Sequence, residues 1–314
     1  MRQSQQEISP ENAENELGEA KISKLLLKFS LPCILSLLIS ALYNIVDQIF
    51  IGNSELGYLG NTAIGVVFPI TIIVQGFAWC FGDGSAAYLS LCQGKKDTKN
   101  AHKCIGTGIV VSVAVSMALI LFLGIFRRPA LRLSGASDQS ISLAEDYFLI
   151  ILFFFPVFML MNMMNSVIRA DGSPRFAMIS MIAGAVTNVI LDYTFMFPMD
   201  MGVDGDAIAT ILGQILSCVI SLFYLKRFKS IDLKKRYFKL QGSMISTVCK
   251  LGVSSFITQM AITVVQVAMN NMLTTYGALS VYGSEIPLSC VGIVIKVNQI
   301  MVSVVVGIAV GAQP

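Results

Sequence analysis

The stretch LLLKFSLPCILSLLISALYNIVDQIFI, residues 25–51, decides the fold class of this chain. It has one basic residue near its start, Lys28, and one aspartate near its end, Asp47, and its other residues are apolar or uncharged. A helix needs about 20 apolar residues to cross the hydrocarbon core of a bilayer. Residues 25–51 therefore predict a membrane-spanning helix.

Seven further stretches have the same character. Their apolar residues follow a helical period or fill the stretch completely, and none alternates as a β-barrel strand does. They run roughly over 63–91, 104–126, 147–168, 176–198, 206–225, 244–276 and 287–312. The sequence therefore predicts an all-α polytopic membrane protein with eight transmembrane helices.

The composition excludes several other classes of protein. Of the 314 residues 55% are hydrophobic and 13% charged, whereas a soluble domain has roughly 25% charged residues. So few charges cannot cover the surface of a soluble protein, and they exclude a disordered chain and a basic nucleic-acid binder. The seven cysteines form no CxxC pair and predict no structural metal site. The lipid bilayer is the predicted partner, and we expect no nucleic acid.

Most basic residues lie on one side of the predicted spans. Eighteen of the 22 fall in the N-terminal tail or in alternate loops, and only Arg127, Arg128 and Arg132 fall in the other loops. Because cytoplasmic loops are enriched in Lys and Arg, this split predicts that the N-terminus and residue 314 are both cytoplasmic. It also predicts an even number of crossings.

The hydrophilic segments divide the chain. We expect a polar cytoplasmic tail over 1–24 and a group of six helices over 25–225. A basic cytoplasmic linker over 226–243 follows, which includes the run KRFKSIDLKKRYFK at 226–239. The remaining two helices occupy 244–314.

Ionisable residues within the predicted spans are functional candidates, because each is costly unless it faces protein or water. Four stand out: Asp47, Asp83, Asp192 and Lys296. Asp83 lies between two glycines, and we interpret it as a contact between helices. Lys296 would pair with a carboxylate across the bundle or extend toward the interface.

Asp47 and Asp192 are predicted to lie at a similar depth. Asp47 precedes the glycine that closes the first span by five residues, and Asp192 precedes the proline that closes the fifth by six. At about 1.5 Å per residue, both lie roughly 8–9 Å below the outer loops. Asn44 and Asn188 lie one turn deeper on the same faces, and Tyr43 joins the first face.

This arrangement suits a coupling ion. Two neighbouring carboxylates in a medium of low dielectric constant cannot both remain ionised without compensation, so they take up a proton. Alternatively they bind sodium, with Asp47, Asn188 and Asp192 as oxygen ligands. A third interpretation is that the aspartates only hold neighbouring helices together. The candidate residues of a substrate cavity are Tyr43, Gln75, Lys296 and Gln299.

Several motifs follow one another along the chain. They are Leu31-Pro32 with Tyr43-Asn44-Ile-Val-Asp47, Gly65-Val-Val-Phe-Pro69, Ile168-Arg169-Ala-Asp171-Gly172, Asn188 through Asp192, Gly202-Val-Asp-Gly205 and Gly311-Ala-Gln313-Pro314. No single motif is diagnostic, but the ordered set covers roughly residues 24–314. It resembles the multidrug and toxic compound extrusion (MATE) family. Asp206 departs from the family pattern, which has a small residue at that position, and Lys296 leaves the chemistry of the second lobe open.

The resemblance implies a secondary active antiporter of the cell membrane, either a plasma membrane or a bacterial inner membrane. It would export amphipathic, often cationic, organic compounds in exchange for protons or sodium ions, without a cofactor. Asp47, Asp192, Asn44 and Asn188 would form the cation site. Family members have twelve helices in two six-helix lobes, so the resemblance also implies a sequence truncated after its eighth helix. At full length we expect a monomer.

Three other interpretations compete with the antiporter. A lipid-linked oligosaccharide flippase of the same superfamily would need a more cationic cavity to hold a pyrophosphate. An intramembrane aspartyl protease would need two catalytic aspartates, but Gly82-Asp83-Gly84 and Leu191-Asp192-Tyr193 are not its motifs and lie near opposite membrane faces. We therefore expect no enzyme. The third alternative is a fragment that does not transport.

Overall fold

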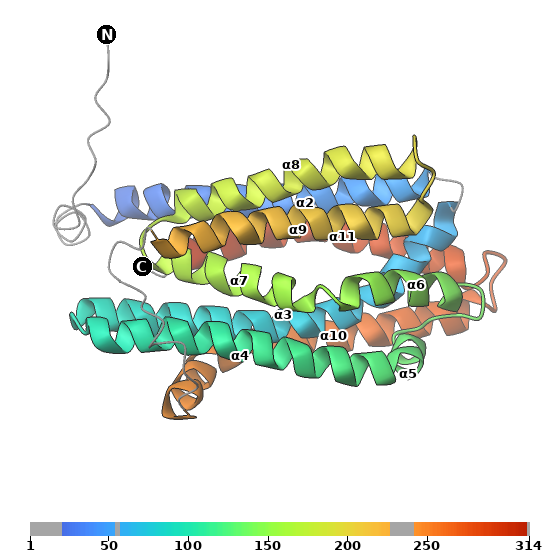
Figure 1. The fold of residues 1–314 in the computed structure, drawn as a ribbon. Helices are drawn as coiled ribbons and strands as arrows, with labels where there is room; N and C mark the ends of the chain where they lie inside the picture. The colour runs from blue at the N-terminus through green and yellow to red at the C-terminus, as the bar shows by residue number, and fades with distance from the viewer. Residues whose placement is uncertain (1–20, 54–56, 227–241, 313–314) are drawn as a thin grey trace, which may run out of the picture.

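The computed structural model describes residues 21–53, 57–226 and 242–312, and it is helical almost throughout (Figure 1). No strand occurs within these ranges. Most of the predicted tail 1–24 and of the predicted linker 226–243 lies outside them. The helices are α2 Ile22–Gly52, α3 Gly57–Gly94, α4 Thr98–Ile125, α5 Arg127–Leu133, α6 Ile141–Leu152, α7 Phe155–Ala170, α8 Pro174–Met196, α9 Gly202–Phe223, α10 Gly242–Gly277 and α11 Glu285–Gly311.

Seven of these helices are long and apolar enough to cross a membrane, and α6 with α7 makes an eighth crossing if the two form one span. The predicted all-α polytopic fold is therefore confirmed. The bounds of the long helices differ from the predicted spans by a few residues at each end, because polar residues continue a helix beyond its apolar part.

The predicted fourth span, 147–168, is not one straight helix. The chain bends by 59° between α6 and α7. Pro156 stands in the first turn of α7 and has no N–H to donate to the carbonyl of Leu152, the last residue of α6. The helix therefore ends at Leu152 and begins again at Phe155.

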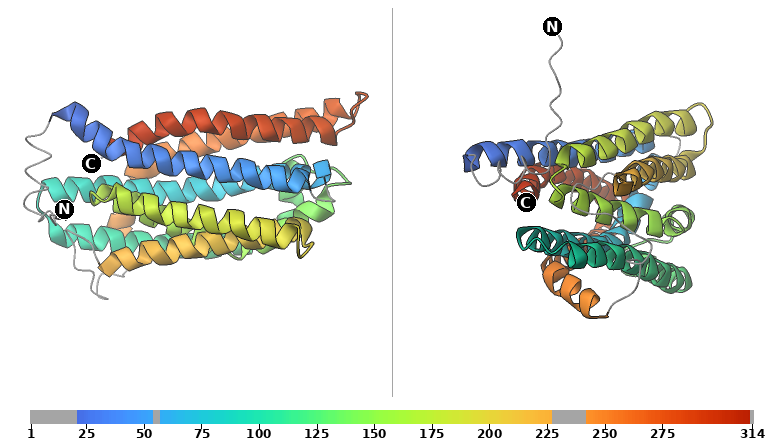
Figure 2. Two further views of the ribbon diagram at one scale, coloured as in Figure 1. Left: turned by 90° about the horizontal axis from the view of Figure 1, so that it is seen from above. Right: turned by 60° about the vertical axis from the view of Figure 1, so that its left-hand side comes forward.

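Two helices organise the bundle. α2 lies between α11 on one side and α8 on the other (Figure 2). α3 packs most extensively on α10 and also contacts α7 and α4. We call α2 to α9, residues 22–223, the N-terminal bundle, and α10 with α11, residues 242–311, the C-terminal pair.

The start of α2 and the end of α11 lie at the same end of the bundle (Figure 1). Arg127, Arg128 and Arg132 are the three basic residues of the loops that carry little positive charge. They lie at the other end of the bundle, around α5 and the start of α6. Arg127 and Arg128 both pair with Glu145, the second at 2.8 Å, and Arg132 pairs with Asp138. Acidic partners therefore accompany all three basic residues at this end.

α3 and α10 cross with their main chains in contact. A methyl group added at Gly84 would overlap the carbonyl of Val248, and one added at Gly252 would overlap that of Cys80. Asp83 lies beside this crossing and accepts a hydrogen bond of 2.8 Å from Ser255 of α10. It accepts another of 2.9 Å from Ser166 of α7. The interpretation of Asp83 as a contact between helices is thereby confirmed.

A candidate cation site formed by three aspartates

The site is built on the antiparallel contact between α8 and α9. Gly184 of α8 faces Gly213 of α9, and an added methyl group at either glycine would lie 2.6–2.7 Å from the other's carbonyl oxygen. Because neither residue has a side chain, the two backbones come close together. One turn further along, the amide of Asn188 donates a hydrogen bond of 3.2 Å to the hydroxyl of Thr210.

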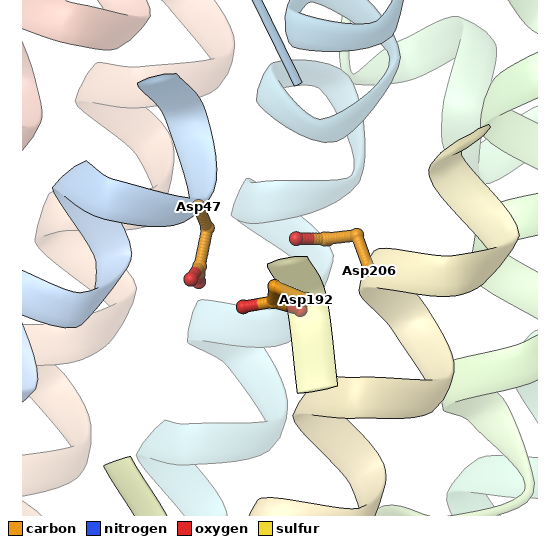
Figure 3. Close-up of side chains that lie close together, drawn as sticks. All are labelled: Asp47, Asp192 and Asp206. Carbon is orange, nitrogen blue, oxygen red and sulfur yellow. The ribbon is translucent and has the colours of Figure 1, made fainter. Parts of the chain in front are cut away.

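The next layer of the same contact holds two carboxylates. Asp192 follows Asn188 by four residues on α8, and Asp206 precedes Thr210 by four residues on α9. Asp47 of α2 completes a group in which one carboxylate oxygen of each residue lies within 4.8 Å of those of the other two. The three side chains point toward one another from three helices (Figure 3). We call Asp47, Asp192 and Asp206 the acid cluster.

The acid cluster is buried, and most of its carboxylate oxygens have no hydrogen-bond donor among the described residues. Asp47, Asp192 and Asp206 are 6%, 0% and 2% exposed. Among the described residues no partner donates to Oδ1 of Asp47, to Oδ1 of Asp206 or to either carboxylate oxygen of Asp192. Buried acceptors of this kind are normally hydrogen-bonded. Their convergence therefore suits a cation or protons as the missing partner.

Two tyrosines and a lysine lie around the cluster. Tyr43 of α2 and Tyr147 of α6 both interact electrostatically with it, and Tyr147 also hydrogen-bonds to Asp206. The ammonium of Lys296 interacts with Asp47 and Asp206 and donates a hydrogen bond of 2.9 Å to the backbone oxygen of Asn44. Of the two predicted placements, Lys296 therefore has the one in which it reaches across the bundle, and its side chain does not extend toward the interface.

A cavity of about 50 Å³ lies next to the cluster, on the side of Asn188 and the contact between Gly184 and Gly213. Its polar lining comes from α2, α8 and α9, the same three helices that hold the carboxylates. These residues are Ser40, Tyr43, Asn188, Thr210, Gln214 and Ser217. Oδ1 of Asn188 and Oγ of Ser217 have no partner among the described residues, so the cavity offers hydrogen-bonding atoms to small polar guests.

The predicted site residues do not all come together. Asp47, Asp192 and Asn188 are neighbours, as the depth argument predicts. The amide of Asn44 instead donates a hydrogen bond of 2.7 Å to Ser40 of its own helix. Gln75 is half-buried in α3, and Gln299 is exposed on α11.

Asp206 is the member of the cluster that the sequence reasoning missed. The predicted sixth span began at residue 206, which put this aspartate at the membrane boundary. In the structure α9 begins at Gly202, so Asp206 lies a full turn inside the helix. The sequence holds one signal for Asp206. It precedes Thr210 by four residues, so the two polar side chains share one face of the helix.

The two aspartates of the protease alternative belong to different sites. Asp83 hydrogen-bonds to Ser166 and Ser255, whereas Asp192 lies with Asp47 and Asp206. An aspartyl protease needs its two carboxylates around one water, so the structure contradicts a catalytic pair formed by Asp83 and Asp192.

The sequence model of the MatE family matches residues 32–194, which is more than half of the chain. The chain belongs to the MATE family. The match contains two members of the acid cluster, Asp47 and Asp192, together with Asn188. Asp206 and Lys296 lie beyond the matched residues.

Curated MATE relatives are longer than this chain. The multidrug export protein MepA of Staphylococcus aureus is 26% identical over 268 residues, which are 84% of this chain and 59% of MepA. MepA of Staphylococcus haemolyticus matches with the same identity and coverage. This chain therefore spans about three fifths of the curated relatives it matches.

Solved MATE structures share the fold. The MATE multidrug transporter DinF-BH, solved with a bound dye, superimposes with a TM-score of 0.81 at 30% identity, over 94% of this chain and 67% of that chain. An inward-facing multidrug resistance MATE transporter of the MOP superfamily superimposes with a TM-score of 0.78 at 21% identity. The superposition covers 92% of this chain and 64% of that chain. The second likeness concerns the fold alone.

Proposed function

We propose that the protein is a secondary antiporter that exports amphipathic organic cations in exchange for protons or sodium ions. Membership of the MATE family, the naming of MepA as a multidrug export protein and the dye complex of DinF-BH support export of small organic molecules. The acid cluster supports cation coupling, because three buried carboxylates, most of whose oxygens have no donor among the described residues, need compensating positive charge.

The coupling site of this proposal is the acid cluster with Asn188. Asp47 and Asp192 bind the coupling ion, and the free oxygen of Asn188 is a further ligand for sodium. Asp206 adds a third carboxylate. The amide of Asn44 is hydrogen-bonded within its own helix, so Asn44 contributes to this site with its backbone oxygen, which accepts a hydrogen bond from Lys296. Both ions remain in the proposal, since protons and sodium use the same oxygen atoms.

The substrate would approach the polar surfaces next to this site. Tyr43 lies beside Asp47 and has an aromatic ring of the kind that binds organic cations. Gln75 and Gln299 remain candidate substrate residues on α3 and α11. The excess of acidic groups at the site disfavours the flippase, because a pyrophosphate would be repelled by buried carboxylates.

The orientation is part of the proposal. The end of the bundle that holds the start of α2 and the end of α11 would face the cytoplasm, where the basic loops belong. Alkaline phosphatase fused within 137–140 should be active and the same enzyme fused after residue 96 inactive; the reverse pattern would invert the topology. We further propose a monomer, which light scattering of the purified protein would check.

The experiment uses cells that lack their major efflux pumps and express the protein, with any native C-terminal extension. Ethidium retention is measured under imposed proton and sodium gradients. We expect one gradient to drive export and Asp47→Asn or Asp192→Asn to abolish the response to it. Asp138→Asn is the matched control, because Asp138 is exposed, pairs with Arg132 and is not a member of the acid cluster.

Two results would contradict the proposal. If the wild-type protein exports no cation under either gradient, the antiporter function is wrong. If it exports ethidium but both aspartate variants retain full ion dependence, the coupling site lies elsewhere.

A further inference from the structure

Lys296 brings a positive charge from the C-terminal pair to the N-terminal bundle. Its Nζ donates a hydrogen bond of 2.9 Å to the backbone oxygen of Asn44 on α2. Asn44 precedes Asp47 by three residues, so the ammonium lies about one helical turn from the acid cluster. A lysine in the middle of a long apolar helix is held there by a specific partner.

The packing of α11 against α2 fixes this position. One turn before Lys296, a methyl group added at Gly292 would lie 3.4 Å from the amide nitrogen of Gln48 on α2. Three turns after it, one added at Gly307 would lie 2.7 Å from the Cα of Ile34. The ammonium therefore occupies the contact between the two helices and is not free to turn toward lipid.

Charge balance explains why a lysine stands here. The acid cluster contains three carboxylates, and no Lys or Arg of the described residues forms an ion pair with them within 4.0 Å. The ammonium of Lys296 interacts with two of the three, Asp47 and Asp206. The other polar side chains that act on the cluster are those of Tyr43, Tyr147 and Asn188, which carry no formal charge. An isolated buried charge is unfavourable unless it is compensated.

We propose that Lys296 is the counter-cation that the C-terminal pair supplies to the acid cluster, and that it balances the third carboxylate, Asp206. When the site is empty, the ammonium compensates the cluster and holds α11 on α2. A bound coupling ion supplies the same charge and weakens that hold. This inference rests on the proposed function, because it makes the Lys296 ammonium compete with the coupling ion for the acid cluster.

The test is a double-mutant cycle with Lys296→Met, Asp206→Ala and the double variant, in the protein with any native C-terminal extension. Lys296→Met should raise the apparent affinity for the driving ion, since a competing cation is lost. Asp206→Ala should lower that affinity, since a carboxylate is lost. Each shift should be about tenfold, and the double variant should return toward the wild type.

Two variants serve as controls. Lys250→Met removes an exposed lysine from α10 and should change neither affinity nor stability. Lys296→Arg keeps the positive charge and should retain most of the wild-type ion dependence. Opposite shifts in the two single variants are the decisive sign, because loss of a merely structural contact would not raise ion affinity.

Thermal unfolding of the purified variants supplies the second measurement. Each single variant should unfold at a lower temperature than the wild type, and the double variant should recover part of the loss. If Lys296→Met alone does not fold, rescue of folding by Asp206→Ala supports the pairing.

The inference is overturned if the two losses of unfolding temperature simply add in the double variant, or if both single variants shift ion affinity in the same direction. Persistent misfolding of the double variant overturns it as well. A wild-type protein without ion-driven efflux would instead refute the proposed function, and the unfolding cycle would still decide the pairing of Lys296 with Asp206.

Discussion

Asn188 on α8 donates a hydrogen bond of 3.2 Å to Thr210 on α9, one turn from the carboxylates of Asp192 and Asp206. This bond joins two helices whose aspartates lie in the next layer. It therefore fixes the separation of Asp192 from Asp206 through the backbone, and it leaves the oxygen of the Asn188 amide without a partner among the described residues.

Replacing Thr210 by valine should weaken this contact without changing the shape of the side chain. We expect a loss of about 1 kcal/mol in the free energy of unfolding, because the buried amide of Asn188 loses its acceptor. Thr194→Val is the matched control, since the Thr194 hydroxyl is exposed and bonds only within its own helix. Equal effects of the two changes, measured by thermal unfolding in detergent, would show that the contact does not stabilise the fold.

Gly213→Ala should disturb the acid cluster from two turns away. The new methyl group would lie 2.6 Å from the carbonyl oxygen of Gly184, so α8 and α9 must separate. Such overpacking typically costs about 1–3 kcal/mol. Gly65→Ala is the control, because an added methyl group there meets no atom within 4 Å. Thermal unfolding checks the stability, and a Gly213→Ala protein as stable as Gly65→Ala would contradict the predicted clash.

Asp83→Ala should affect stability and not the identity of the driving ion. The change removes the acceptor of both Ser166 and Ser255 and a carboxylate that acts on the buried Arg169. Loss of a buried hydrogen-bonded partner costs about 1–3 kcal/mol. Ser255→Ala, which removes one of the two bonds, should cost less.

The same variants distinguish Asp83 from the acid cluster. Residual ethidium efflux by Asp83→Ala should keep the ion dependence of the wild type after correction for the amount of folded protein. A shift in ion dependence comparable to that of Asp47→Asn would show instead that Asp83 takes part in coupling.

The capping residue of α4 predicts a pH-dependent stability. Asp97 accepts a hydrogen bond of 3.1 Å from the backbone N–H of Asn100, and this bond lowers the pKa of the Asp97 carboxyl. A lowered folded-state pKa gives stability that is present above the unfolded pKa, about 3.9, and is lost as pH falls through the folded value. The wild type should therefore unfold at a higher temperature than Asp97→Ala near pH 7.

This difference in unfolding temperature should shrink as the pH is lowered below about 4, where the carboxyl becomes protonated. Asp97→Asn keeps an acceptor without a titrating charge, so its advantage over alanine should not depend on pH in this range. A constant gap between the wild type and Asp97→Ala from pH 7 to pH 3 would contradict the assignment.

Hydropathy alone predicts nearly all of the fold, because membrane helices must bond their own backbone and be apolar along their length. The break at Pro156 is the exception. A proline inside an apolar run either bends a membrane helix or ends it, and the neighbours decide which. Pro32 and Pro69 both lie inside continuous helices, α2 and α3.

Depth arithmetic could predict the pairing of Asp47 with Asp192, because both helices end at recognisable loops. It could not predict Asp206, since the start of a span is read from its first apolar residues and α9 begins with Gly202-Val-Asp-Gly. The local bond of the Asn44 amide was equally hidden, because an asparagine in a helix bonds either to its own turn or across to a neighbour.

The main-chain crossing of Gly84 with Gly252 has a mechanical consequence. Two helices that touch backbone to backbone have no side chains at that point whose rotamers can change to allow sliding. A movement of α10 relative to α3 that keeps this contact is a rotation about the crossing, with Asp83 and Ser255 beside the pivot. The distant ends of the two helices would swing in opposite directions, so a small change at one membrane face would be accompanied by a reciprocal change at the other.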